Sequence, residues 1–171
     1  MDSNKHFAKV ASQFLKNKKN IKVINKDILK LNQKKKIIIC LGTITIFDNP
    51  IILIKKIINL MLPNSIAIID GIFNDYDCDV KIKYRDRSQD SSLKKWHSNI
   101  NIHSKKTIKD FLQKQKNIKF NFLDYKIDTV IKKNNKKPHI NWWTEKDNLN
   151  DLYLTNGLMI KKNNNFLVIK N

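Results

Sequence analysis

The chain has 171 residues, with 34 Lys plus Arg against 15 Asp plus Glu and a formal net charge of +19. This length suits one domain, and the composition excludes a collagen, a disulfide scaffold and a membrane protein. A hydrophobic fraction of 41% also excludes a wholly disordered chain, because a core can be buried.

The positive charge has two explanations. A chain this basic attracts polyanions such as nucleic acid. However, 32 of the bases are Lys and only Arg85 and Arg87 are Arg, whereas phosphates and bases are usually recognised by the planar fork of Arg. Lys, Ile and Asn together supply 82 residues and share A/T-rich codons. We therefore favour a compositional bias and expect no specific nucleic-acid partner.

The cysteines and the N-terminal residues bear on localisation. Cys40 and Cys78 are far apart and lack the spacing of zinc ligands, so we expect a reducing cytoplasm. The first 20 residues contain no apolar segment of the kind a signal peptide needs. No apolar run approaches the roughly 18 residues of a membrane span, so we expect no membrane partner.

The first half of the chain predicts alternating strands and helices. Residues 3–19 suit a helix that Ser3 caps, with apolar side chains on one face. A short strand is expected over 21–24, and the run from Ile37 to Leu41 is typical of a strand buried on both faces of a parallel sheet. Pro50 opens a helix to about Met61, a turn follows at 63–64, and 66–72 predicts a second buried strand.

The second half of the chain does not continue this alternation of strands and helices. Residues 73–101 are rich in Asp, Asn and Ser and suggest an inserted loop or lid on the substrate side. Ser104 caps a further helix, and a strand is expected over 120–127, followed by a polar loop over 128–150. Strand-like segments at 152–154 and 166–169 flank the turn signal Asn156-Gly157, which predicts an antiparallel C-terminal hairpin. The order of elements favours an α/β fold with a mostly parallel sheet in one domain, 1–171.

Ligands of open α/β sheets bind beyond the carboxyl ends of the strands. Three groups of residues follow the predicted strands and should meet at one rim: Asp27, then Leu41-Gly42-Thr43 with Phe47, then Gly71 with Asn74 and Asp75. Glycine at such a position lets a backbone approach a ligand closely, although it can also simply make a turn.

Three segments carry a family resemblance: MDSNKHFAKVA, KVINKDILKL, and IIICLGTITIFDNP with LIKKIINLMLPNSIAIIDGIFN after it. They resemble a class I S-adenosylmethionine-dependent methyltransferase of the small-molecule and saccharide-associated branch. The resemblance implies a Rossmann-like sheet with flanking helices and S-adenosylmethionine as cofactor. It also implies that Asp2, with Ser3 after it, binds the cofactor ribose and that Asp27 with Ile28 borders the adenine, while Leu41, Gly42, Thr43 and Phe47 complete the cofactor site.

The resemblance does not extend to the first elements of the family's domain. The first strand and Gly-rich loop of the family, which hold the methionine part of the cofactor, have no counterpart in the sequence. We therefore expect the chain to correspond to about the C-terminal two-thirds of a methyltransferase domain, incomplete at the N-terminus, with a missing N-terminal half as a possible partner.

Candidate substrate residues lie in the insert. His97 is the candidate base for a hydroxyl acceptor, although a surface loop histidine is the plainer interpretation. The side chains that could hold a small-molecule or saccharide acceptor are Asn74, Asp75, Tyr84, Arg85, Trp96 and Asn99. Asp75, Asp77 and Asp79 have a spacing that suggests a cation, but the Gly and distal Glu of an EF-hand are missing, so no metal is expected.

Three functions stay open on the sequence alone. The first is a partial methyltransferase acting on a small molecule or saccharide-type acceptor, inactive as an isolated chain. The second is a non-catalytic remnant or one half of a split enzyme. The third is a basic nucleic-acid-binding module, which lacks both a recognised motif and aromatic residues interleaved with the bases.

Overall fold

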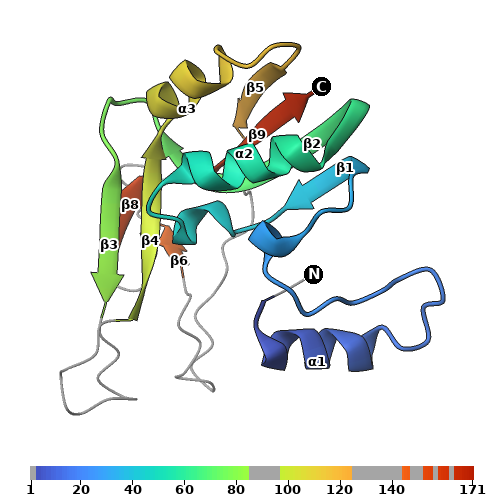
Figure 1. Ribbon diagram of the computed structural model, residues 1–171. Helices are drawn as coiled ribbons and strands as arrows, with labels where there is room; N and C mark the ends of the chain where they lie inside the picture. The colour runs from blue at the N-terminus through green and yellow to red at the C-terminus, as the bar shows by residue number, and fades with distance from the viewer. Residues whose placement is uncertain (1–2, 85–96, 125–143, 147–151, 156–157, 162–163) are drawn as a thin grey trace.

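The computed structural model describes residues 3–84, 97–124, 144–146, 152–155, 158–161 and 164–171. The chain is α/β, and its main sheet has six strands (Figure 1). These are β1 (Lys35–Cys40), β2 (Met61–Asn74), β3 (Val80–Tyr84), β4 (His97–Ser104), β5 (Lys119–Asp124) and β9 (Asn164–Lys170). The sheet order is β3-β4-β2-β9-β5, with β1 also paired to β2.

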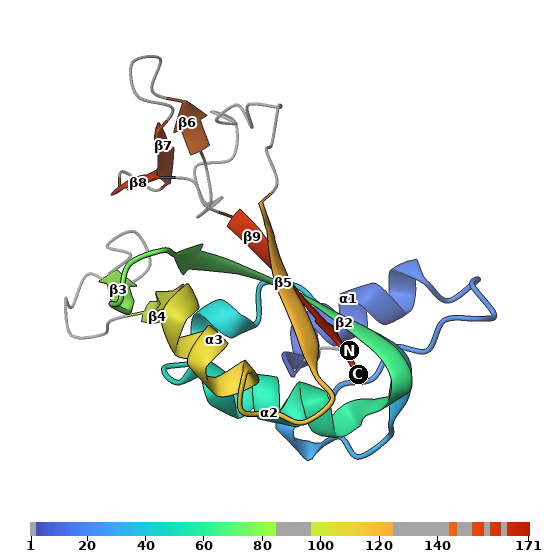
Figure 2. The same ribbon diagram turned by 90° about the horizontal axis from the view of Figure 1, so that it is seen from above.

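Four of the six strands run in the same direction. β1 and β4 are parallel to β2, and β5 has the direction of β2 because both pair antiparallel with β9. The prediction of an α/β fold is therefore confirmed, but the sheet is mixed rather than mostly parallel, because three of the five strand pairings within it are antiparallel. β1 reaches β2 through α2 (Pro50–Leu60), and β4 reaches β5 through α3 (Lys105–Leu112). Figure 2 shows both helices on the same side of the sheet.

The core lies between the sheet and these two helices. The predicted helix from Pro50 is confirmed as α2. Asn49 caps this helix by accepting from the Ile51 N–H at 3.0 Å. Its apolar stripe packs on alternate residues of β2 and β9. The fully buried members of this core are Ile44, Leu53, Ile54, Ile57, Ala67, Ile69, Phe73, Ile108, Leu112, Leu167 and Ile169.

The predicted turn at 63–64 lies inside β2. The strand begins at Met61, directly after α2, and pairs with β1 through Lys35↔Met61 and Ile37↔Ile66. Between these two pairs β2 has four residues and β1 has one, so the extra residues bulge. Asn64 accommodates the bulge with a positive φ of 57°. The turn signal thus produces an irregularity in the strand and does not end it.

The sequence also predicted β1 to be buried on both faces, and this is wrong. Ile38 and Cys40 point toward α2, but Ile37 and Ile39 on the other face are 66% and 62% exposed. In the described part of the chain, β1 pairs only with β2. No described helix covers the face of the sheet that carries Ile37 and Ile39 (Figure 2).

The N-terminal elements are shorter than predicted. Helix α1 spans Lys5–Phe14, and its cap is Asn4, whose Oδ1 accepts from the His6 N–H at 2.9 Å. Residues 21–24 form no strand, and the next elements are the 3₁₀ turns η1 (Ile28–Lys30) before β1 and η2 (Ile44–Ile46) after it. The apolar face of α1 finds little to pack against, because Phe7 and Phe14 remain exposed.

The insert and the C-terminal segment also differ from their predictions. Within 73–101, residues 75–79 form a loop after β2, but β3 and most of β4 also lie in this range, pair antiparallel and extend the main sheet. The predicted partner of 152–154 is wrong. β7 (Leu152–Thr155) pairs with β8 (Leu158–Lys161) in a small sheet with β6 (Thr144–Lys146). The predicted turn at Asn156-Gly157 lies outside the described residues. Residues 166–169 belong to β9.

The helix and strand predicted around residues 104–127 are confirmed within the described residues. Ser104 caps α3 by accepting from the Lys106 N–H at 3.2 Å. β5 ends at Asp124, and the rest of the predicted strand, 125–127, lies outside the described residues. Among the described helices, none is long and apolar enough to cross a membrane.

Candidate functional site

The carboxyl ends of β1, β2 and β4 meet at one edge of the main sheet, which we call the rim. β1 runs parallel to β2, and the last residues of β2 pair with the last residues of β4 through Phe73↔His103 and Asn74↔Ser104. The rim is therefore built from three segments: residues 41–48 after β1, residues 74–79 after β2, and His103 with Ser104 at the end of β4. Ligands of open α/β sheets bind at such edges.

The segment after β1 turns sharply at Gly42. Gly42 has φ +63°, and no atom lies within 4 Å of the position that a Cβ would take. Glycine is thus needed here for its backbone conformation, and it leaves open space beside the chain. Thr43 and Thr45 fold the turn, since the Thr45 hydroxyl donates to the Gly42 carbonyl at 2.8 Å and the Thr43 hydroxyl to that of Leu41 at 3.2 Å.

Cys40 closes the inner side of this turn. Its thiol is buried at the end of β1, and burial raises its pKa, partly offset by a hydrogen bond with Thr43. A buried neutral thiol is a poor nucleophile and a poor metal ligand. Cys40 therefore belongs to the core and supplies no chemistry to the rim.

Strand β4 anchors the same segment from the other side. The Asn101 amide donates to the Phe47 carbonyl at 2.8 Å and to Asp48 Oδ1 at 3.4 Å. His103 Nε2 lies 3.1 Å from the carbonyl oxygen of Ile44. Because a carbonyl can only accept, this ring nitrogen carries the hydrogen. Both side chains are almost fully buried, at 3% and 1% exposed, so they fix the position of η2.

Residues 74–79 attach to the N-terminus of α3. Asp79 Oδ1 accepts from the Ser104 N–H at 2.7 Å and lies 3.8 Å from His103 Nδ1. Asp75 pairs with Lys105 at 2.9 Å. A carboxylate at a helix N-terminus satisfies an unpaired N–H and complements the helix dipole. Asp79 thus takes the place that an anionic ligand of α3 would need.

The acidic residues of the loop continue this pattern of pairing. Asp77 lies 2.5 Å from Lys106 Nζ and raises the pKa of that ammonium group. The Asn74 amide donates to the Cys78 carbonyl at 2.8 Å, and its oxygen accepts from the Tyr76 N–H at 2.9 Å. The side chains of Asn74 and Asp75, both predicted to bind substrate, are therefore engaged within the protein. Among the described residues, no group of three His, Cys, Asp or Glu side chains could hold a metal ion.

Gly71 does not open space for a ligand. It lies inside β2, and a Cβ there would approach Ile44 Cγ2 to 2.5 Å and Phe73 Cζ to 2.8 Å. The glycine lets η2 pack directly on the sheet. The two glycines of the predicted rim thus have different roles: Gly42 shapes an exposed turn, and Gly71 accommodates a buried contact.

The first predicted group, around Asp27, is a separate cap. Asp27 Oδ1 accepts from the Leu29 N–H at 2.9 Å and so starts η1, while Ile28 packs against the core. Among the described residues, no hydrogen bond or ion pair joins Asp27 to the segments after β1 and β2. Ser3 is exposed before the cap of α1. The structure thus brings together the second and third predicted groups, whereas the hydrogen bond of Asp27 lies within its own cap of η1.

The predicted catalytic histidine lies at the other end of β4. His97 begins this strand and pairs with Tyr84, whereas the rim is formed by the end of the strand. At about 3.3 Å per residue, His97 is roughly 20 Å along the strand from His103. The side chains of Tyr84, His97 and Asn99 lie outside the described residues, as do Asp2, Arg85 and Trp96 entirely.

The sequence analysis missed Asn101 and His103. A signal for them was present in the segment INIHSKK, where polar residues alternate with Ile just before a helix cap. On a strand, this alternation places Asn101 and His103 on one face. The predicted loop over 73–101 includes Ile100 and Asn101 and therefore conflicts with this strand period.

Comparison with known proteins gives no family assignment. No protein-family model matches the chain, and no curated protein matches it either.

Proposed function

We propose that the chain is part of a class I S-adenosylmethionine-dependent methyltransferase domain that acts on a small-molecule or saccharide-type acceptor. The observation that carries the proposal is the rim, where an exposed glycine turn at Gly42 follows a parallel strand and is held in place by β4. The parallel crossover from β1 through α2 to β2 agrees with the Rossmann-like arrangement that the resemblance implies.

The residues around Gly42 fit one side of the cofactor. Leu41 and Gly42 are exposed, and the space beside Gly42 allows a flat ring to lie against the backbone. Asp27 has one carboxylate oxygen occupied by its cap, which leaves the second to accept a hydrogen bond. Leu41, Gly42, Thr43 and Phe47 would form the wall of this site, and S-adenosylmethionine would supply the methyl group.

The described residues offer fewer groups for binding the methyl acceptor than for binding the cofactor. Methyl transfer depends mainly on holding the acceptor in line with the sulfonium. Asn74 and Asp75 are held by Cys78 and Lys105, so their contribution is to shape the loop after β2. This engagement favours the alternative of a non-catalytic remnant or half of a split enzyme, and the experiment must separate the two.

Calorimetric titration with S-adenosylhomocysteine tests the proposal. We expect the isolated chain to bind no tighter than about 100 µM, which corresponds to about 5.5 kcal/mol. We expect the chain extended by the protein sequence encoded directly upstream to bind more tightly than this. The extended chain with Gly42→Val should lose at least tenfold in affinity, because Val is strained at positive φ. Ile52→Glu, an exposed change on α2, is the matched control and should bind like the extended chain.

Each result decides between the alternatives. Binding by the isolated chain below about 100 µM would exclude the remnant and support the cofactor site directly. If the upstream sequence encodes no Gly-rich strand and loop and neither chain binds, the methyltransferase proposal fails and the remnant is left.

A further inference from the structure

His103 is a buried titratable side chain that faces both loops of the rim. Its Nε2 lies 3.1 Å from the carbonyl oxygen of Ile44 in η2, and its Nδ1 lies 3.8 Å from Asp79 Oδ1 in the loop after β2. The side chain is 1% exposed, and within the described residues Nδ1 has no hydrogen-bond partner. One ring nitrogen thus holds the segment after β1, while the other points at the segment after β2 without bonding to it.

A neutral imidazole leaves this second contact incomplete. Because Nε2 carries the hydrogen that the Ile44 carbonyl accepts, Nδ1 of the neutral ring has only a lone pair. An ionised Asp79 also presents only lone pairs, and its Oδ1 accepts from the Ser104 N–H at 2.7 Å. No hydrogen lies between Nδ1 and Oδ1, and a buried polar atom without a partner is unfavourable. One proton added to Nδ1 supplies the missing donor and produces a charge-assisted hydrogen bond.

The charges of the rim also leave room for this proton. Three of its carboxylates each lie beside the ammonium group of one lysine. These ion pairs are Asp48 with Lys81 at 2.5 Å, Asp75 with Lys105 at 2.9 Å and Asp77 with Lys106 at 2.5 Å. For the fourth carboxylate, Asp79, the basic group within ion-pair distance among the described residues is His103. A proton on His103 therefore gives Asp79 the opposite charge that the other three already have.

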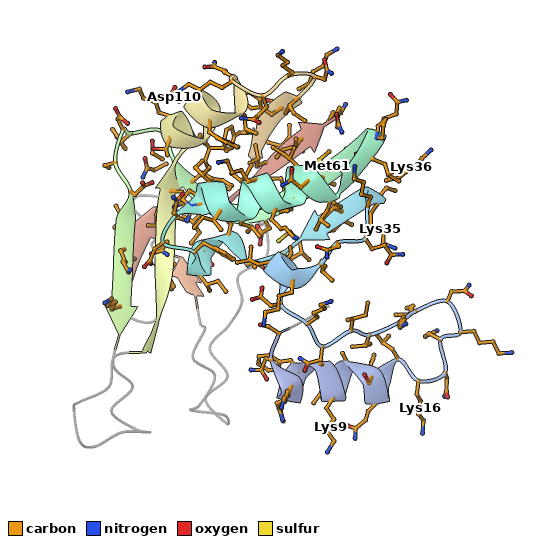
Figure 3. The ribbon with its side chains drawn as sticks, in the orientation of Figure 1. Lys9, Lys16, Lys35, Lys36, Met61 and Asp110 are labelled. Carbon is orange, nitrogen blue, oxygen red and sulfur yellow. The ribbon has the colours of Figure 1, made fainter. Side chains whose placement is uncertain are left out.

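The elements packed against β4 do not replace this proton. They are mainly β2, β3, η2 and α3. Neither η2 nor the last four residues of β2 carry a charged side chain, and the buried Cys40 thiol at the end of β1 is neutral. From β3, Lys81 and Lys83 act on Asp48. On α3, Asp110 (Figure 3) helps to raise the pKa of Lys106. The positive end of the α3 dipole opposes a cation at His103, and Asp79 offsets it.

We propose that His103 is a pH-dependent latch between the two loops of the rim. With a proton on Nδ1, the ring donates to both the Ile44 carbonyl and Asp79, and so it holds residues 74–79 beside η2. Loss of this proton keeps the bond to Ile44 but leaves Asp79 with the Ser104 N–H alone. The loop is therefore held more tightly at low pH and is released as the pH rises through the titration of His103. An imidazole ordinarily makes this exchange between about pH 5 and 8. This inference does not rest on the proposed methyltransferase function.

Nitrogen-15 NMR of the imidazole rings in the full chain measures the protonation of His103 directly. The chain has four histidines, and the signals that disappear in His103→Gln assign this ring. We expect a neutral ring with its hydrogen on Nε2 at about pH 8 and a doubly protonated ring at about pH 5.5. Asp79→Asn removes the carboxylate charge, so the same ring should hold its proton less tightly in that variant.

Hydrogen exchange measures whether the proton closes the latch. After correction for the intrinsic effect of pH, the amides of residues 74–79 should be protected at least about threefold more at pH 5.5 than at pH 8. His103→Gln retains an N–H donor for Ile44 but does not titrate, and Asp79→Asn retains an oxygen for the Ser104 N–H. Both variants should lose the pH dependence. His6→Gln removes a histidine from α1, far from β4 (Figure 1), and is the matched control that should keep it.

Three results would overturn the proposal. The first is one unchanged protonation state of His103 from about pH 5 to 8, whether neutral or doubly protonated. The second is protection of residues 74–79 that is constant or rises with pH. The third is the same pH dependence in both His103→Gln and Asp79→Asn, which would assign it to another group. The first two measurements use the unmodified chain and decide the matter even if a variant fails to fold.

Discussion

On the face of β2 that α2 and α3 cover, Ala67 and Ile69 are fully buried, whereas Ile66 and Ile68, one residue away in the same strand, are only half-buried. On the neighbouring strand β1 the contrast is larger, because Cys40 is buried and Ile39 is 62% exposed. The residues compared on both faces are apolar. An apolar sequence therefore indicates that a strand can be buried, whereas the helices that pack on the sheet determine which of its two faces is buried.

The largest expected effect comes from removing side-chain volume on the covered face. Ile69→Ala should lower the free energy of unfolding by about 2–5 kcal/mol, because it removes buried atoms and leaves a cavity. Ile68→Ala is the matched change on the opposite face of β2, where the side chain is only half-buried, and should cost less than half as much. Urea unfolding of both variants measures the difference. Equal losses would mean that Ile68 is packed as closely as Ile69.

The next effect concerns Gly42 in the rim and Gly71 inside β2. Gly71→Ala should lower stability by about 1–3 kcal/mol, because its Cβ would overlap Ile44 and Phe73 on the covered face. Gly42→Ala meets no atom within 4 Å, so it should cost only the backbone strain of positive φ, about 1 kcal/mol. Thermal unfolding of the pair checks the order. A harmless Gly71→Ala would contradict the packing of η2 on β2.

The buried hydrogen bond of His103 should come next. His103→Phe keeps an aromatic ring but leaves the Ile44 carbonyl without its donor, at a cost of about 1–3 kcal/mol. His103→Gln retains an N–H donor and should lose less. Denaturant unfolding compares the two variants, and hydrogen exchange at residues 43–48 reports whether η2 loosens. If Phe is tolerated better than Gln, the ring contributes by packing alone.

The smallest effect is a pH dependence at an exposed pair. Lys81 lies 2.5 Å from Asp48 and lowers the pKa of that carboxyl group. The ionised pair therefore stabilises the fold above the ordinary pKa of 3.8, and this contribution is lost as the pH falls through the lowered pKa.

Lys81→Met tests this sign. The melting temperature of the variant should lie slightly below that of the original chain at about pH 6, and the two should converge near pH 2. Exposed pairs contribute little, so the difference should be the smallest in the series. A difference that grows toward low pH would show that the pair does not stabilise the folded state.

The elements that local chemistry specifies were predictable. Asn49 and Pro50 start α2, Ser104 starts α3, and both helices have an apolar stripe that the sheet covers. Two of the three predicted rim groups also meet, because parallel strands end at the same edge. The alternation that places Asn101 and His103 on one face of a strand is visible in the sequence, but their hydrogen-bond roles are not. Their hydrogen-bond partners in Phe47 and Ile44 are more than fifty residues away in sequence.

By itself, the sequence determined the α/β class, the two helices that cover the sheet and the glycine turn after β1, because periodicity, caps and turn residues act over a few neighbouring positions. Only the tertiary structure decided that the strand over 166–169 joins β2 and β5, that Pro63-Asn64 becomes a bulge and that β1 keeps an exposed face. Each of these depends on which strand or layer lies alongside. Pairing and burial are properties of that neighbour as much as of the residue, and the neighbour is distant in the chain.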